Sequence, residues 1–432
     1  MSIAFRLLLI LILIVPAAAL SDGLLVQCLV AILAAAALAV VAMSARAADV
    51  SFMVQATRYF GLAAVVPAIW MIIQIMPTPL SAMSHSIWIN AKEALNQGSW
   101  GHISVDVGAT MEALAFYLAN VALIVVGIFV ARDRRRAELL LFALTAISTL
   151  TAIALLIARS GLIESLFRSE TNEMLSSLSS LGVILWLAIG VRFIERQEAK
   201  EAKTQRPRQD MQRLLALTGA GLLICIAGLA AAGTLNTALV VVFGALVFGS
   251  IQAIRRIDLA GWGTGTSVVT LIAAAAMVIL WRYDNVRALS PFLRFATSAS
   301  ADSIAVAQRM LSDAGWKGIG AGAYALLVPV YQELGVSAPR APSTGATFAI
   351  ELGWPIALFA IAATIGLVII LFRGALVRGR DSFYPAAAAA CTVTVLGQAF
   401  CDTSLLHSSI AIVVDLVVAL GLAQSKSQAT GR

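Results

Sequence analysis

The chain has 432 residues, of which 60% are apolar and 12% are charged, and its mean hydropathy is +0.92. Soluble domains average about 45–50% apolar and 25% charged residues, so this composition excludes an ordinary soluble protein. The formal net charge is +7, and the four cysteines form no CxxC or Cys/His cluster. The sequence therefore predicts neither a metal site nor a disulfide framework, and lipid is the expected solvent for most of the chain.

Twelve apolar segments are each close to the ~20 residues that a helix needs to cross ~30 Å of hydrocarbon. They predict an all-α membrane protein with about 12 transmembrane helices. In chain order, the predicted spans are residues 4–20, 24–43, 54–76, 112–131, 139–158, 175–194, 214–232, 237–254, 266–281, 354–372, 385–401 and 409–424.

The first span has an alternative interpretation. Arg6 precedes a core rich in Leu and Ile, and the segment ends in a run of small residues after Pro16. The same order is found in a cleaved secretory signal peptide. Cleavage would leave the orientation of every other span unchanged.

Lysines and arginines are divided unequally between the connections on the two sides of the membrane. Alternate connections, which include residues 132–136 and the linker 192–213, hold 21 of the 30. The positive-inside rule therefore places these connections and both termini in the cytoplasm, and the expected location is the bacterial inner membrane. Because basic runs of this kind determine topology, we expect no nucleic-acid partner.

The predicted spans divide the chain into three parts. Residues 1–281 form a transmembrane bundle of spans 1–9 with an outer loop at 77–111. Residues 282–353 form one large periplasmic loop between spans 9 and 10. Residues 354–432 hold spans 10–12 and a cytoplasmic tail. Loops longer than about 15 residues are usually functional or disordered, and the aromatic residues within the large loop indicate order.

Two features stand out within the large loop. Residues 302–313 have the period of a short amphipathic helix, with Ile304, Ala307 and Met310 on one face. The glycine-rich residues 315–324 follow, but no strand precedes them and no GK[ST] follows them, so a nucleotide loop is not predicted. We expect a flexible re-entry into the membrane, which requires only the conformational freedom of glycine.

Arginines on the outer side oppose the positive-inside bias, which indicates that they serve another purpose there. Arginine holds phosphate oxygens with two parallel hydrogen bonds, so a group of arginines at the membrane surface suits a lipid-linked diphosphate. Each has the alternative of pairing with a loop carboxylate such as Glu164, Glu170 or Asp313. The candidate substrate-binding residues are Arg159, Arg168, Arg294, Arg309 and Lys317.

Three stretches of the sequence occur in an order that resembles a known family. They are WGHISVD at 100–106 with Ala109 and Thr110 after it, GIGAGAY at 318–324 with PVY at 329–331, and ELG at 351–353. Together with about twelve spans, cytoplasmic termini and a large late periplasmic loop, they resemble the bacterial O-antigen ligase and O-antigen or exopolysaccharide polymerase superfamily. The resemblance covers most of the chain in topology and a small part of it in motifs.

The resemblance implies a membrane glycosyltransferase that transfers or polymerises a glycan from a polyprenyl diphosphate on the periplasmic face, in the assembly of a surface polysaccharide. It implies no metal and no other cofactor. The implied partners are the polyprenyl-diphosphate-linked glycan, membrane lipids and polysaccharide-assembly proteins. In that family, periplasmic arginines bind the diphosphate and a loop histidine activates the acceptor. Arginines neutralise the charge that develops on the leaving group, and a base deprotonates the attacking hydroxyl.

This sequence has no histidine near residues 342–344, where the family has one, and this favours a polymerase-like member over a ligase. The catalytic candidates are therefore Arg340 beside the leaving group, Glu351 as the first candidate for the base, and Tyr331. His85 and His102 stay open as further candidates for the base. Glu351 has the alternative of a helix N-terminal charge that the helix dipole stabilises.

A secondary transporter or flippase for a lipid-linked or small anionic substrate is the alternative function. Twelve spans with both termini inside suit a transporter of two six-span halves. Asp415 lies in the middle of a predicted span, where it suits either a proton relay or a buried hydrogen bond between helices. The sequence shows no internal repeat and no chain of His, Glu or Lys in the other spans, so the transferase is favoured.

Overall fold

The computed structural model of the chain describes residues 3–21, 23–78, 83–96, 100–160, 169–201, 209–233, 235–257, 289–296, 299–333, 340–378 and 381–425. Throughout these residues the regular secondary structure is helical, and the β-pairing is limited to one isolated bridge between Thr78 and Gly101.

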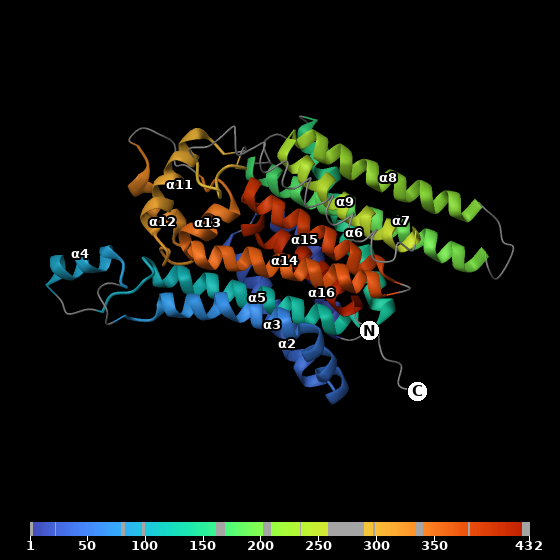
Figure 1. The fold of residues 1–432 in the computed structure, drawn as a ribbon, viewed down its shortest axis with the longest axis horizontal. Helices are drawn as coiled ribbons and strands as arrows, with labels where there is room; N and C mark the ends of the chain where they lie inside the picture. The colour runs from blue at the N-terminus through green and yellow to red at the C-terminus, as the bar shows by residue number, and fades with distance from the viewer. Residues whose placement is uncertain are drawn as a thin grey trace.

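Long apolar helices make up the body of the molecule (Figure 1). They are α1 (Ile3–Leu20), α2 (Leu24–Ser44), α3 (Ala47–Ile75), α5 (Val107–Ala131), α6 (Arg134–Arg159), α7 (Ser169–Glu201), α8 (Gln209–Ala232), α9 (Leu235–Ile257), α14 (Trp354–Val377), α15 (Phe383–Cys401) and α16 (Ser408–Ser425). Ten of the helices in the described ranges are each long and apolar enough to cross a membrane. The α3 helix adds an eleventh if its two parts, which meet at 69° between Arg58 and Phe60, count as one span.

The prediction of a multi-pass, all-α membrane protein is therefore confirmed. Each predicted span coincides with one of the long helices, except the span at 266–281, which lies outside the described residues. The boundaries differ most at α3 and α7, and α5 begins five residues before the predicted span. The Asp106 side chain caps this helix by accepting the Ala109 N–H at 3.0 Å, so the helix starts in a polar stretch that hydropathy does not count.

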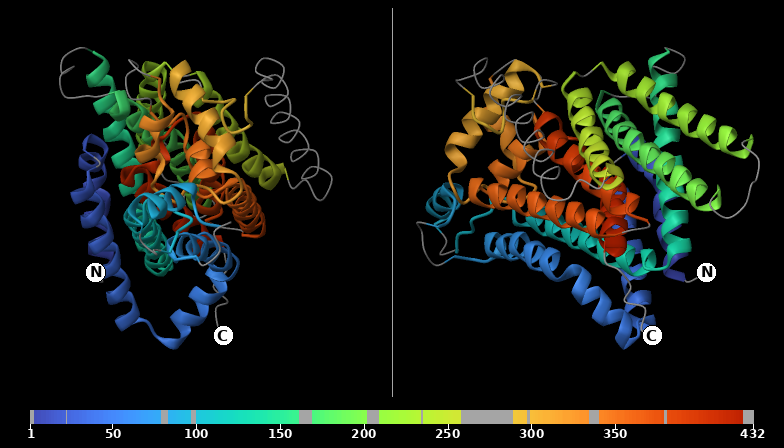
Figure 2. Two further views of the ribbon diagram at one scale, coloured as in Figure 1. Left: turned by 90° about the vertical axis from the view of Figure 1, so that its left-hand side faces the viewer. Right: turned by 45° about the vertical axis from the view of Figure 1, so that its right-hand side comes forward.

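Short helices gather at one end of the bundle, which we call the loop end. They are α4 (Ser86–Leu95), α11 (Ala301–Ala314), α12 (Tyr324–Tyr331), α13 (Thr344–Glu351) and the 3₁₀ helix η2 (Ser404–Leu406). Figure 1 shows α4, in light blue, projecting furthest from the bundle, and the left view of Figure 2 looks onto this end. The predicted amphipathic helix is confirmed as α11, with Ala307 and Met310 buried and Arg309 exposed.

The opposite end of the bundle, which we call the basic end, is closed by ion pairs between helix ends. The pairs are Arg132–Asp49, Arg134–Asp381, Arg192–Glu138, Arg196–Glu138 and Arg255–Glu195. The acids and bases come from the ends of α3, α5, α6, α7 and α9 and from the turn between α14 and α15. Charge is thus concentrated toward the helix ends at this side of the bundle.

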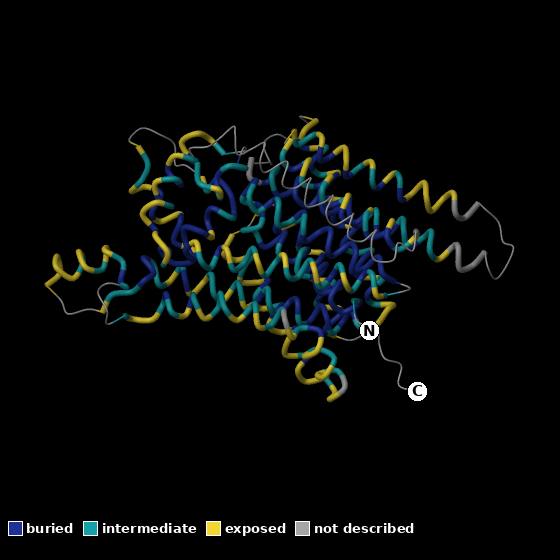
Figure 3. The backbone as a smooth tube through the Cα atoms, viewed as in Figure 1, coloured by how far each residue is buried: buried dark blue, intermediate teal, exposed yellow. Residues whose placement is uncertain are grey.

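The centre of the bundle is formed by α7, α15 and α16, and the outer faces of the other helices remain apolar. The most apolar 18 residues are 83% buried in α16 and 78% buried in α7, but only 11% buried in α14. Figure 3 shows the buried centre in dark blue and the exposed outer faces in yellow. Exposed outer residues include Leu13, Leu62, Leu223 and Ile365. Outer faces of this kind are suited to lipid, because lipid chains are as apolar as leucine.

The contact of α16 with α14 and α15 depends on a glycine. A Cβ atom on Gly421 would overlap the Cβ of Ala388 and approach Leu371 Cδ2 to 2.9 Å, whereas a Cβ on Gly366, on the outer side of α14, would meet no atom within 4 Å. We predict that Gly421→Ala lowers the free energy of unfolding by about 1–3 kcal/mol through overpacking. Gly366→Ala is the control and should leave it unchanged or slightly higher. Thermal unfolding in detergent measures both, and equal melting temperatures for the two variants would contradict the packing.

Candidate functional site

Residues 315–323, which we call the glycine loop, connect α11 to α12 at the loop end. Four of its glycines have positive φ, between 61° and 106°. Backbone hydrogen bonds hold the loop on two sides: the Gly320 N–H donates to the Glu351 carbonyl at 3.0 Å, and the Val105 N–H donates to the Ile319 carbonyl at 2.8 Å. The predicted flexibility of this loop is therefore wrong, because these hydrogen bonds hold it to α13 and to the first outer loop. Its re-entry into the membrane stays a prediction.

Gln74, near the end of α3, supplies the glycine loop with side-chain partners. Its side chain is fully buried. Its Nε2 donates to the carbonyls of Lys317 (3.1 Å) and Glu351 (3.0 Å), and its Oε1 accepts the Ala321 N–H at 3.3 Å. One side chain thus satisfies three backbone groups that no helix or strand pairs, which is what buried irregular backbone requires.

The first outer loop docks on the other side of the glycine loop. Ser104 Oγ and Thr110 Oγ1 form a buried hydrogen bond of 2.7 Å, and Thr110 Oγ1 also donates to the Ala321 carbonyl at 2.9 Å. The Ser104 N–H donates to the Gln74 carbonyl at 3.1 Å. Trp88 of α4 closes the arrangement by donating its Nε1–H to the Ser104 carbonyl at 2.8 Å.

Gly320 is the point of closest approach between these segments. A Cβ atom there would lie 2.7 Å from Ser104 Cβ and 2.9 Å from Ser104 Cα, and the φ of Gly320 is +106°. Both conditions require glycine, since a side chain would need space that the backbone of the outer loop occupies and a backbone conformation that other residues rarely adopt. The stretches 100–110, 318–324 and 351–353 therefore meet in one place.

The Glu351 carboxylate is buried at this meeting point. Its side chain is 7% exposed, and its Oε1 accepts the Tyr324 N–H at 3.1 Å. Burial raises the pKa of Glu351 from 4.5 to about 7, although hydrogen bonds from the backbone of Gly322 and Tyr324 oppose the rise. Burial and the nearby Glu351 also raise the pKa of Tyr324 to about 12. Glu351 thus anchors the glycine loop to the end of α13.

One sequence expectation for Glu351 needs correction. Glu351 is the last residue of α13, and α14 begins only at Trp354, so the carboxylate is not a helix N-terminal charge stabilised by the dipole. Arg340 precedes α13, at its opposite end. Eight helical residues span ~12 Å, so the length of α13 lies between the two backbones, and a joint catalytic role of Arg340 and Glu351 stays a prediction.

Tyr331 and Arg309 join α11 to α12 on the outer side of the loop end. A hydrogen bond from Tyr331 to Asp313 forms there, and burial, followed by this bond, raises the pKa of the phenol. Arg309 donates to the Tyr331 carbonyl at 3.1 Å and pairs with Glu333 at 2.6 Å. Both candidate residues therefore hold α11 and α12 together. Arg309 of α11 contacts the end of α12 and Glu333 after it, and Tyr331 of α12 contacts Asp313 of α11.

The other candidate cations lie at separate points of the loop end. Arg294 Nε donates to the Leu289 carbonyl at 3.1 Å, and Lys317 Nζ donates to the Met83 carbonyl at 3.4 Å. Arg159 donates to the Ala232 carbonyl at 3.1 Å, between α6 and α8. These contacts are with three different carbonyls, and a shared site of the candidate cations stays a prediction. Arg168 lies outside the described residues.

The second half of the candidate site is at the start of α13. Thr344 donates both its N–H (2.8 Å) and its hydroxyl (3.1 Å) to the Asp402 carbonyl, in the turn between α15 and α16. The buried Asp402 carboxylate accepts the N–H and the hydroxyl of Ser404 and lies 3.5 Å from Ser177 Oγ. Burial raises the pKa of Asp402, although these hydrogen bonds and the nearby His407 oppose the rise. Arg340 is exposed four residues before Thr344, at this end of the helix.

A tryptophan group surrounds the glycine loop at the level where the long helices end. Trp70 donates its Nε1–H to the Leu352 carbonyl at 2.8 Å, and its ring lies 6.1 Å from that of Trp316. Trp316 and Trp354 are about half exposed, at 49% and 51%. Tryptophan is enriched at the edges of bilayers, so the candidate site lies at the level expected for lipid headgroups.

Sequence reasoning missed Gln74, Asp402 and Ser177 as members of this site. The one available signal was polarity, since Gln74 is an amide within an apolar segment and Asp402 is a carboxylate directly after one. Neither signal names a partner, and two of the contacts, Gln74 with Glu351 and Asp402 with Ser177, join residues more than 200 positions apart in the sequence.

The buried Glu351 gives a prediction for the pH dependence of stability. Its pKa is about 7 in the folded chain and 4.5 ordinarily. The unfolded state therefore loses its proton first, and up to about 3 kcal/mol of stability that is present below pH 4.5 is lost as the pH rises through 7. Glu351→Gln cannot ionise and should lack this loss. Melting temperatures at pH 5, 6, 7 and 8 test this, with the exposed Glu112→Gln as the control. A constant difference between Glu351→Gln and wild type at every pH would contradict it.

Comparison of the chain with models of known protein families finds no match, and a search of curated proteins finds no similar sequence.

Proposed function

We propose that the chain is a membrane glycosyltransferase that transfers or polymerises a glycan from a polyprenyl diphosphate, as in O-antigen or exopolysaccharide assembly. One observation carries the proposal. Three stretches resemble the O-antigen ligase and polymerase superfamily. The first, at 100–110, lies more than 200 residues before the other two, yet all three meet around Gly320 and Glu351. Their place at the ends of the long helices suits a donor whose lipid lies in the membrane and whose diphosphate lies at its surface.

Orientation is part of this proposal. The ion pairs of the basic end involve arginines from the connections that the positive-inside rule assigns to the cytoplasm. The loop end then faces the periplasm of an inner-membrane protein. Ile257 ends α9 at the basic end, beside Arg255, whereas Phe295 is bound by Asn236 at the loop end. Twelve spans follow if the chain crosses once more between these two points, with residues 282–353 as the large periplasmic loop.

The proposed reaction is a displacement at the anomeric carbon of the donor sugar. The oxygen of an acceptor hydroxyl forms the new glycosidic bond, the bond from carbon to the diphosphate oxygen breaks, and the polyprenyl diphosphate leaves. Arg340 neutralises the charge that develops on this leaving group. Arg340 suits the role because it is exposed at the start of α13, and its guanidinium can hold two phosphate oxygens.

The base that receives the hydroxyl proton is assigned to His407 in this proposal. Among the candidates from the sequence, Glu351 is buried against the glycine loop, and Tyr331 is bonded to Asp313. His85 caps α4 by accepting the Ile87 N–H at 3.3 Å. The Nδ1 of His102 lies 2.8 Å from the Ile75 carbonyl.

His407 follows the turn that holds Asp402, at the same end of α13 as Arg340. Its ring is half-buried and lies within electrostatic reach of the Asp402 carboxylate. A carboxylate beside an imidazole stabilises the imidazolium that forms when the ring takes up a proton. In this assignment Glu351 and Gln74 are positioning residues, which hold α13 in place through the glycine loop.

Asp415 favours a secondary transporter or flippase as the second candidate function. Its Oδ2 is buried in α16 and has no hydrogen-bond partner among the described residues, and the same is true of Asn120 Oδ1 on α5. A carboxyl group in the middle of a bilayer is costly, and such groups often serve proton coupling. Uptake driven by a proton gradient, lost in Asp415→Asn and with no glycan transfer, would favour this function over the transferase.

Reconstituted transfer tests the proposed chemistry. We expect transfer or polymerisation from a polyprenyl-diphosphate-linked glycan in proteoliposomes that contain a metal chelator. Arg340→Lys should lose most of the rate, because lysine keeps the charge but not the planar fork of donors. Arg135→Lys, an exposed arginine at the basic end, is the matched control and should retain the rate. Unchanged activity of Arg340→Lys would remove Arg340 from the site, and a strict metal requirement would reject the mechanism.

Cysteine labelling tests the orientation. In a chain whose four cysteines are replaced, Ser300→Cys lies at the N-cap of α11 on the loop end, and Thr204→Cys lies in the basic linker. In intact spheroplasts a membrane-impermeant reagent should label position 300 and not position 204, and permeabilisation should expose 204. Labelling of position 204 alone in intact spheroplasts would reverse the proposed orientation.

A further inference from the structure

Arg192, on α7 at the basic end, is a charged side chain that the protein does not fully satisfy. Its side chain is only 2% exposed. The guanidinium carbon lies 4.6 Å from the ring centre of Phe142 and 5.4 Å from that of Phe193, and Nη2 donates to Glu138. The Nε and Nη1 atoms are also buried, and neither has a hydrogen-bond partner among the described residues.

Two unpartnered nitrogens on one buried guanidinium are costly. A buried donor without a partner loses its hydrogen bond to water and gains nothing in return, at a cost of about 1–3 kcal/mol that is greater for charged groups. Arginine carries five N–H donors and no acceptor, and it stays protonated. A group that completes Arg192 must therefore bring acceptor atoms, and a negative charge would be favoured.

The surroundings of Arg192 also carry an excess of positive charge. We call the following residues the arginine network: Arg134, Arg192 and Arg196, with the acids Glu138 and Asp381. Glu138 serves both Arg192 and Arg196, and Asp381 serves Arg134. Three arginines thus share two carboxylates in this network, which gives it one net positive charge.

Two arginines of the network are accessible at the basic end. The side chains of Arg134 and Arg196 are 53% and 44% exposed, whereas that of Arg192 is buried. Arg192 lies within electrostatic reach of both and of Asp381. The network therefore combines one buried guanidinium with two long, exposed ones.

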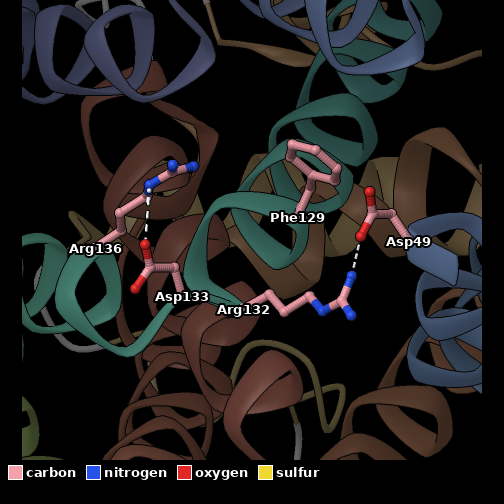
Figure 4. Close-up of a pocket in the computed structure, with 5 residues that line it drawn as sticks. All are labelled: Asp49, Phe129, Arg132, Asp133 and Arg136. Carbon is pink, nitrogen blue, oxygen red and sulfur yellow. Dashed lines mark hydrogen bonds and ion pairs between the residues drawn. The ribbon is translucent and has the colours of Figure 1, made fainter. Parts of the chain in front are cut away.

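A neighbouring pocket at the basic end has equal numbers of positive and negative side chains, unlike the arginine network. It has a volume of about 280 Å³ and is lined by Asp49, Phe129, Arg132, Asp133 and Arg136 (Figure 4). Each of its two arginines has an acid of its own, since Arg132 pairs with Asp49 and Arg136 with Asp133 at 3.3 Å. Its lining carries no net charge, so it offers an anion no electrostatic advantage over water.

We propose that the arginine network binds a phosphate-type oxyanion, with the unpartnered N–H groups of Arg192 at the base of the site. Phosphate oxygens are acceptors only, their charge offsets the excess of the network, and guanidinium groups are their preferred protein partners. The position at the end of the helices allows two sources of the same chemistry, which are the headgroup of an anionic phospholipid and a free phosphate or diphosphate. This site lies at the end of the bundle opposite the proposed transferase site and is independent of it.

Ligand-dependent thermal stability of the purified full-length chain tests the proposal. The chain is delipidated in a non-ionic detergent, and its melting temperature is followed by tryptophan fluorescence. One arm titrates inorganic phosphate and diphosphate at an ionic strength held constant with sodium chloride. The other arm compares nanodiscs of phosphatidylglycerol with nanodiscs of phosphatidylcholine. A ligand that binds only the folded state raises the melting temperature in a saturable way.

We expect a saturable rise with phosphate or diphosphate if the source is aqueous, and a rise confined to phosphatidylglycerol if the source is lipid. Either result supports the site. Arg192→Gln should weaken the apparent affinity by roughly 10- to 100-fold, the loss expected for one hydrogen bond to a charged group. Arg196→Gln should weaken it in the same direction, and this exposed position keeps the test decisive if Arg192→Gln does not fold. Arg132→Gln, from the balanced pocket, is the control and should keep the wild-type affinity.

Three outcomes would overturn the proposal. The first is a melting temperature of the wild type that responds to neither phosphate, diphosphate nor phosphatidylglycerol. The second is an equal response to sodium chloride alone, which would indicate general screening of charge. The third is an equal loss of affinity in Arg132→Gln and in the two network variants. Because this site is independent of the proposed transferase site, the three measurements can be interpreted even if the transferase assay fails.

Discussion

The need of irregular backbone for hydrogen-bond partners inside the protein is the constraint on which the loop end depends. Long helices satisfy their own backbone, but the glycine loop does not, and water cannot supply partners where the loop is buried. The side chains of Gln74 and Thr110 and the carboxylate of Glu351 replace it. The same need explains why polar residues of this region are buried instead of exposed, and why α13, which ends at Glu351, has a fixed place between the glycine loop and Asp402.

The buried ionisable groups differ between the two ends of the bundle, with carboxyl groups at the loop end and an arginine at the basic end. At the loop end, burial raises the pKa of Glu351 and of Asp402, and the N–H and O–H donors around each carboxyl group oppose the rise. At the basic end, Arg192 stays protonated, and its buried charge is only partly matched by Glu138. The loop end thus holds buried acids that accept hydrogen bonds from the backbone, whereas the basic end holds a buried positive charge, for which we propose an added anion.

Hydropathy was sufficient to predict the long helices and amphipathic period was sufficient for α11, because both depend on residues close in sequence. The glycine loop could not be predicted, since its partner Thr110 is 211 residues from Ala321. The sequence showed arginines on the outer side but could not show that Arg309 would bind Glu333 and the Tyr331 carbonyl. It placed Glu351 and Arg340 in one centre but could not show that the two-turn α13 lies between their backbones.

The contacts that close the loop end also set an order of events during synthesis. The hydrogen bond of Gln74 to the Glu351 carbonyl needs a residue that is made 277 residues later, and that of Trp70 to the Leu352 carbonyl needs one made 282 residues later. Chains are made at about 5–20 residues per second, so roughly 14–55 seconds separate the emergence of α3 from that of its partners. The first spans can enter the bilayer as they are made, but their outer ends stay open through most of translation. The last third of the chain is the part that closes them.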